Sequence, residues 1–109
     1  MEFLLQIEVR LPAEMPEEER ARLTVAERER GSELCDEGVI RAIWRIPGRL
    51  ANCAIWSARD ATRLHEAITS LPRWRYLEVE VTPLARHELG PACAGLPPGL
   101  TDPPAPLPA

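Results

Sequence analysis

The sequence predicts an α+β fold in which two helices cover one face of a single antiparallel sheet. Apolar and polar residues alternate at 2–10 and at 76–82, which indicates strands. Between them lie two segments with apolar residues at helical spacing. A Pro-Gly pair also separates two β-rich runs, at 39–46 and 50–56, as in a hairpin. The order β-α-β-β-α-β is typical of ferredoxin-like domains.

The first strand and the first helix are delimited by prolines and charge. Leu11-Pro12 ends the strand that begins at residue 2. Pro16 suits the first turn of a helix, and residues 17–19 are glutamates, which the positive end of the helix dipole stabilises. The helix is predicted to run to Glu37, because Gly38 suits the left-handed position that follows a helix end.

The second half of the domain is bounded by similar signals. Pro47-Gly48-Arg49 predicts the hairpin turn, and Ser57 or Asp60 can cap the second helix. Pro72 stops this helix before the last strand. The two faces of that strand carry Leu77, Val79 and Val81 on one side and Tyr76, Glu78 and Glu80 on the other.

Residues 1–87 therefore form the predicted domain, and residues 88–109 form a C-terminal tail. The tail holds seven of the 12 prolines. It is too rich in proline to build a core, so we expect it to be extended or disordered. An arm lying across a neighbouring subunit is the alternative.

Composition excludes several classes of function. A net charge of −4 with a pI near 5.2 argues against broad nucleic-acid binding. All 13 cationic residues are arginines, so lysine chemistry such as Schiff-base formation is excluded. The scattered cysteines and the distant His65 and His87 predict no metal site and no disulfide framework. We find no signal peptide or membrane span and expect a cytoplasmic protein without cofactors.

Two helices leave the other face of the sheet uncovered. If Phe3, Leu5 and Ile7 meet the helices, the strands at the two ends of the domain expose Leu4, Gln6, Glu8, Tyr76, Glu78 and Glu80. The hairpin adds either Arg41, Ile43 and Arg45 or Ala42 and Trp44. It also adds Asn52 with Trp56 if Ala51, Cys53 and Ile55 point to the helices. This mixture is too apolar for water and too polar for a dry core. We therefore expect a homodimer, sheet against sheet, around a cavity that binds a small-molecule substrate.

Carboxylates and arginines are the candidates for catalysis. Glu80 is the first candidate base, with Glu78 on the same face; the alternative is that both face solvent. Glu27 interrupts an apolar helix stripe, so it either pairs with a strand arginine or serves as the base. Arg41 and Arg45 share a predicted strand face, where they can bind a carboxylate or an enolate oxygen, or form salt bridges.

Five more residues are candidates for substrate binding: Trp44, Asn52, Trp56, Tyr76 and His87. The aromatic residues either line the cavity or belong to the core. Asparagine is disfavoured in strands, so Asn52 is expected to make a specific hydrogen bond. Histidines change charge near neutral pH, which makes His87 a candidate for proton transfer or anion binding. His65 is expected to pack against the sheet.

From Met1 to His87 the chain resembles the muconolactone Δ-isomerase family without a gap. The matching positions are Phe3, Leu11-Pro12, Glu27, Gly38, Arg41, Trp44-Arg45, Gly48, Ala51-Asn52, Leu64-His65, Leu71-Pro72, Tyr76, Glu80-Val81 and Arg86-His87. The resemblance implies ferredoxin-like dimers assembled into larger rings. It also implies a cofactor-free isomerase that moves a proton within an unsaturated lactone bearing a carboxylate, in aromatic degradation. Such a reaction needs a base, a donor for the dienolate and a cation for the carboxylate.

Several polar positions of the family are replaced here. The family has a histidine and a basic residue where this chain has Leu4 and Gln6, Trp-Arg-His at 40–42, a tyrosine at Leu50 and Leu-Phe-Pro at 73–75. These losses favour a larger or more apolar substrate. A tailoring enzyme, such as a cyclase, dehydratase or cofactor-free oxygenase on a polyketide-like substrate, is therefore the alternative to lactone isomerisation. A non-catalytic ligand-binding module is the third possibility.

Overall fold

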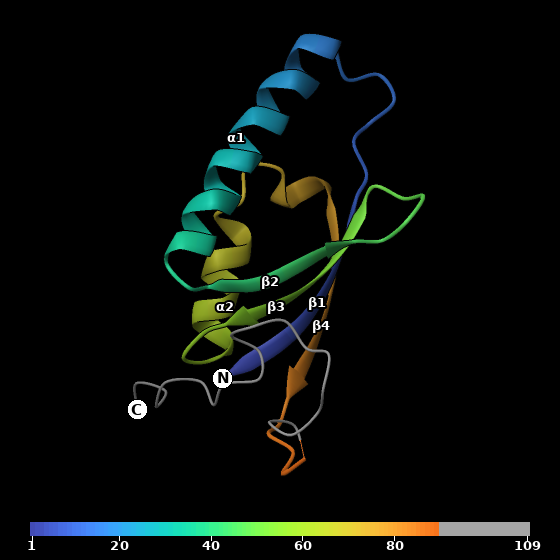
Figure 1. The fold of residues 1–109 in the computed structure, drawn as a ribbon. Coiled ribbons are helices and arrows are strands. Elements are labelled where there is room, and N and C mark those ends of the chain that lie inside the picture. Colours follow the sequence, from blue (N-terminus) through green and yellow to red (C-terminus); the bar gives the residue numbers. More distant parts are fainter. Residues whose placement is uncertain (90–109) are drawn as a thin grey trace.

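The computed structural model describes residues 1–89, so most of the predicted tail lies outside the described residues. The elements are β1 (Glu2–Val9), α1 (Glu17–Asp36), β2 (Ile40–Arg45), β3 (Ala51–Ser57), α2 (Ala61–Thr69), the 3-10 helix η1 (Trp74–Tyr76) and β4 (Leu77–Leu84). The strands form one antiparallel sheet in the order β2-β3-β1-β4. Both helices lie on the same face of this sheet (Figure 1). The predicted α+β fold is confirmed.

Local signals place the helix ends and the hairpin turn where the sequence predicts them. Asp60 caps α2, because its carboxylate accepts a hydrogen bond from the backbone N–H of Arg63 at 2.8 Å. Gly38, after α1, and Gly48, in the hairpin, both have a φ of +78°. This left-handed conformation is unfavourable for residues with a Cβ, so glycine is the residue that suits both turns.

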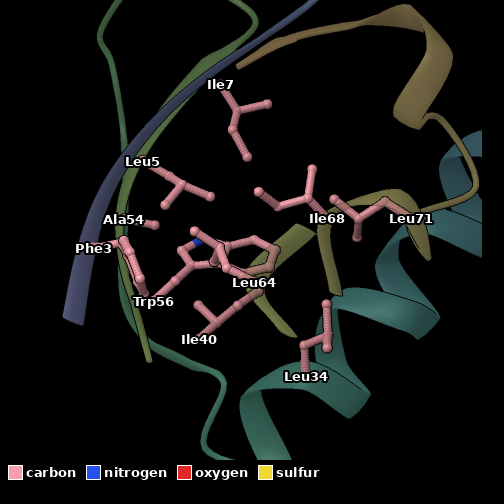
Figure 2. Close-up of a cluster of buried hydrophobic side chains, with 10 residues drawn as sticks. All are labelled: Phe3, Leu5, Ile7, Leu34, Ile40, Ala54, Trp56, Leu64, Ile68 and Leu71. Atoms are coloured by element: carbon pink, nitrogen blue, oxygen red, sulfur yellow. The ribbon is translucent and has the colours of Figure 1, made fainter. Parts of the chain in front are cut away.

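The hydrophobic core lies between the helices and the sheet (Figure 2). The cluster consists of Phe3, Leu5, Ile7, Leu34, Ile40, Ala54, Trp56, Leu64, Ile68 and Leu71. Trp56, Leu5 and Leu34 are the largest of the fully buried side chains. Leu34 is also the buried residue of α1, close to its C-terminal end. The remainder of α1 therefore contacts the sheet less closely than its last turns do.

Strand register decides which side chains face the helices. Phe3 pairs with Trp56, and Ile7 pairs with Asn52. Because paired residues share a face, Asn52 and Trp56 lie on the helix-covered face, which corrects the prediction that they belong to the open one. On β1 and β4 the prediction is right, since Gln6 pairs with Glu80 on the open face.

A β-bulge at Arg41 changes the predicted faces of the hairpin. The register shifts between Ile40 and Ala42, so the alternation along β2 is broken at Arg41. Arg41 and Arg45 therefore do not share one uninterrupted face, as the sequence suggested. Beyond the bulge, Ala42 and Trp44 face the open side, whereas Arg45 pairs with Asn52 on the helix side.

Tyr76 belongs to η1 rather than to the last strand, which corrects a third prediction. Its backbone N–H donates to the carbonyl of Arg73, closing the 3-10 turn at 2.8 Å. Its own carbonyl accepts a hydrogen bond from the N–H of Arg10, also at 2.8 Å. This turn brings the segment after α2 back alongside the end of β1.

Candidate active site

A pocket of about 190 Å³ lies on the helix-covered side of the sheet, against α1. We call it the helix-side pocket. It is lined by Ile7, Val9, Glu27, Arg28, Gly31, Ile40, Ile43, Asn52, Trp56, Leu71, Arg73 and Leu77. Most of these residues are apolar. The volume is below the roughly 300–1,000 Å³ of pockets for drug-sized molecules, so the pocket suits a smaller ligand.

Glu27 projects from α1 into the wall of this pocket, and its side chain is only 14% exposed. Its Oε1 accepts a hydrogen bond from the backbone N–H of Arg73 at 2.9 Å. Its Oε2 lies 3.7 Å from Arg73 Nε, which is within ion-pair range but too long for a hydrogen bond. The main chain thus fixes the carboxylate. One of the two predictions for Glu27 was an ion pair with a strand arginine. The partner is indeed an arginine, Arg73, but it precedes η1 instead of lying on a strand.

Three buried side-chain polar atoms lack a hydrogen-bond partner within residues 1–89: Asn52 Oδ1, Trp56 Nε1 and Arg73 Nε. All three residues line the helix-side pocket. Leaving a buried polar atom unpaired costs about 1–3 kcal/mol, and most such atoms in native proteins are paired. The residues that carry this acceptor and these two donors therefore line one mostly apolar pocket, and polar groups in such a lining are typical of sites that orient a small ligand.

The open face carries a second and more polar pocket, of about 330 Å³, which we call the open-face pocket. It is lined by Gln6, Ile7, Glu8, Ile46, Arg49, Ala51, Glu78, Val79 and Glu80. Arg49 donates a hydrogen bond to Glu8 at 2.9 Å, and Arg10 pairs with Glu78 at 3.2 Å. The hydrogen bond from Arg49 holds the pKa of Glu8 below its usual value, and the charges of Arg49 and Arg10 add to the effect. These exposed charges largely neutralise one another.

The structure brings three predicted site residues together and separates the others from them. Glu27, Asn52 and Trp56 line the helix-side pocket. Glu80 is exposed and lines the open-face pocket, so the sheet lies between it and Glu27. Arg45 is exposed at the end of β2 and lines neither pocket. Glu80 and Arg45 consequently face opposite sides of the sheet.

Glu78 lines the open-face pocket with Glu80, whereas Arg41, Trp44, Tyr76 and His87 line neither pocket. Arg41 is half-buried at the bulge, and Trp44 is 44% exposed on the open face. His87 follows β4, an 8-residue strand that spans about 23 Å at roughly 3.3 Å per residue. Because Leu77, at the other end of β4, lines the helix-side pocket, His87 is distant from it. His65 is exposed and its ring meets that of Trp74 edge-on, rather than packing on the sheet.

Arg73 is the pocket residue that sequence reasoning missed. Its side chain is 20% exposed, and both its backbone and its guanidinium approach Glu27. The available signal was the gain of a charge directly after Leu71-Pro72, where the muconolactone Δ-isomerase pattern has a leucine. That signal does not reveal which side chain the new charge would meet.

Residues 1–89 offer neither a metal centre nor a membrane span. No group of three or more histidine, cysteine, aspartate or glutamate side chains there could hold a metal ion. No helix in this part of the chain has the length and apolar character needed to cross a bilayer. Cys35 and Cys53 are both free thiols.

Comparison with known proteins gives a consistent result. The family model for muconolactone delta-isomerase matches residues 1–89. Muconolactone Delta-isomerase 2 of Acinetobacter lwoffii is 39% identical over 87 residues, which cover 80% of this chain and 91% of the relative. Muconolactone Delta-isomerase of Pseudomonas aeruginosa is 34% identical with the same coverage. A crystal structure of muconolactone isomerase superposes with a TM-score of 0.76 at 33% identity, covering 81% of this chain and 92% of the other.

Proposed function

The chain belongs to the muconolactone Δ-isomerase family, and we propose that it isomerises a small lactone in the helix-side pocket with Glu27 as the base. It is an isomerase, like the relatives named for that activity. One observation supports this choice of pocket. A carboxylate held by the main chain lines a mostly apolar pocket together with three residues that each bury a side-chain polar atom without a hydrogen-bond partner in residues 1–89.

The chemistry is the movement of one proton within an α,β-unsaturated lactone. A base removes the proton from the ring carbon beyond the double bond, and the electron pair spreads through the conjugated system to the carbonyl oxygen. The proton then returns to the carbon next to the carbonyl, so the double bond has shifted and nothing is gained or lost. A single carboxylate can perform both transfers, and Glu27 is assigned this role.

The side chains of Trp56 and Asn52 are assigned to stabilising the developing negative charge and to orienting the lactone ring. The indole N–H of Trp56 is assigned to the lactone carbonyl oxygen, where negative charge develops during proton removal. A fixed donor in a dry pocket stabilises such a charge without having to reorganise. The amide of Asn52 is assigned to orienting the ring, so that the acidic C–H lies against Glu27.

Incubating the purified full-length chain with muconolactone tests this function directly. We expect proton NMR to show the substrate converted to the isomeric enol-lactone, because every group that the reaction needs lines one pocket. Turnover should fall in the usual enzymatic range of about 1–10³ s⁻¹. A muconolactone spectrum that stays unchanged at high enzyme concentration would contradict the proposal.

We also propose that two copies pair through their open faces as a homodimer. Trp44 is 44% exposed there, and Leu4 and Ile55 are half-buried on the same face of the sheet. Covering these apolar side chains would remove them from water. Light scattering should then give at least twice the 12.2 kDa chain mass, and a larger even multiple where dimers assemble further. Trp44→Glu should yield monomers, whereas Trp74→Glu, equally exposed at 44% but on η1, should not. A monomeric wild-type chain at micromolar concentration would refute the pairing.

A further inference from the structure

We propose that Arg73 binds the carboxylate of the substrate and thereby selects lactones that carry an acidic side chain. The inference rests on the proposed function in one respect, because it places the substrate in the helix-side pocket. Nothing in the proton transfer itself requires Arg73. The residue instead decides which molecules are held in position for that transfer.

Arg73 has a buried side-chain donor that makes no hydrogen bond within residues 1–89. A guanidinium has five N–H donors in a planar fork that matches a carboxylate. The Arg73 side chain is only 20% exposed, and its buried Nε finds no hydrogen-bond acceptor within residues 1–89. Its ion-pair partner, Glu27, lies 3.7 Å away, beyond hydrogen-bond distance. A mostly buried cation with a free donor in a ligand-sized pocket suits an anionic group of the ligand.

Charge balance in the pocket also favours an acid as the ligand. Arg73 stands at ion-pair distance from Glu27, so its positive charge offsets the repulsion between Glu27 and an incoming carboxylate. Arg28 lines the same pocket but is exposed, so water already solvates its charge. Of these two arginines, Arg73 has the less solvated charge, so an anionic ligand would stabilise it more than it would stabilise Arg28.

The side chain of Arg73 can be replaced without releasing Glu27. The hydrogen bond of 2.9 Å that fixes Glu27 comes from the backbone N–H of residue 73, which every residue except proline possesses. Arg73→Met keeps much of the length of the stem and removes only the cation. Arg75, exposed on η1 and outside the pocket lining, provides a matched control.

The test measures binding rather than turnover. The two probes are a saturated γ-lactone bearing a carboxymethyl group and its uncharged carboxamide, neither of which can undergo the double-bond shift. By calorimetry, the wild-type chain should prefer the acid. Arg73→Met should weaken binding of the acid by about tenfold or more, as expected for a lost charge-assisted hydrogen bond, and leave binding of the amide nearly unchanged. Arg75→Met, outside the pocket, should bind both probes as the wild type does, and Arg28→Met tests the other arginine of the pocket lining.

Several outcomes would overturn the assignment. These are a wild-type chain without preference for the acid, an equal loss of both probes in folded Arg73→Met, or a selective loss in Arg28→Met instead. Circular dichroism reports folding, and Arg73→Gln replaces Arg73→Met, with the same expected loss of preference, if the latter does not fold. An acid preference that depends on Arg73 in a chain inactive on muconolactone would refute the reaction but not this site. Turnover of muconolactone without a preference for the acid would refute the Arg73 site but not the proposed reaction.

Discussion

Glu27→Gln is expected to lower kcat for muconolactone by about 10²–10⁴-fold, the range that a positioned general base contributes. The amide has nearly the shape of the carboxylate, and its oxygen can still accept the hydrogen bond from the backbone of Arg73. Only the ability to take up a proton is lost. Binding of the saturated lactone acid should therefore persist in the variant, so that the defect appears in kcat and not in the folded fraction.

Glu29→Gln is the matched control for this experiment. Glu29 is an exposed carboxylate of the same helix, two residues from Glu27 and outside the pocket lining, so kcat should not change. The informative rival is Glu80→Gln, because Glu80 was the first candidate from sequence and lines the open-face pocket. If Glu80→Gln removed activity while Glu27→Gln kept it, the chemistry would belong to the open face.

Trp56→Phe is expected to reduce kcat by about 10²–10³-fold, as does the loss of one donor to a developing oxyanion. Phenylalanine keeps an aromatic ring in the core but lacks the Nε1–H, which in the wild type is buried without a partner in residues 1–89. KM should change much less, because the ground-state carbonyl carries little negative charge and gains less from the donor. Steady-state kinetics of the two enzymes separate these effects.

Stability has to be measured alongside, because Trp56 is only 1% exposed and is among the largest fully buried side chains. Thermal unfolding establishes the temperature at which the variant is still folded, and kinetics are compared there. Trp74→Phe is the control, since Trp74 is 44% exposed and meets His65 rather than the pocket. A folded Trp56→Phe enzyme with wild-type kcat would remove the indole from the mechanism.

The elements were predictable because their signals are local. Prolines and glycines mark the ends, and alternation identifies β1 and β4 with the correct faces. The run from Ala51 to Trp56 is different, because it is apolar at nearly every position. Without alternation, its sequence does not show which residues share a face of the sheet. Its face is fixed by pairing with β1, where Trp56 meets Phe3. The phase of β2 was equally hidden, since the bulge at Arg41 leaves no mark in the sequence.

The candidate site was only partly predictable for a related reason. Glu27 was detectable because a charge inside an apolar helix stripe demands a partner. That partner, Arg73, lies 46 residues away in sequence, and their contact depends on how the turn after α2 packs beside α1. On β1 and β4, strand alternation also identifies the residues that lie on the open face of the sheet. A pocket between layers depends on the spacing of helix and sheet, which no periodicity encodes.

The peptide group that holds Glu27 has a consequence for how this scaffold can diversify. Because the anchor at residue 73 is a backbone N–H, the side chain at that position can be exchanged without dislodging the proton carrier. The position of the Glu27 carboxylate therefore does not depend on which side chain residue 73 carries. Substitutions of Arg73, in natural relatives or by engineering, are thus expected to change the preference for acidic lactones while the carboxylate of Glu27 stays in place.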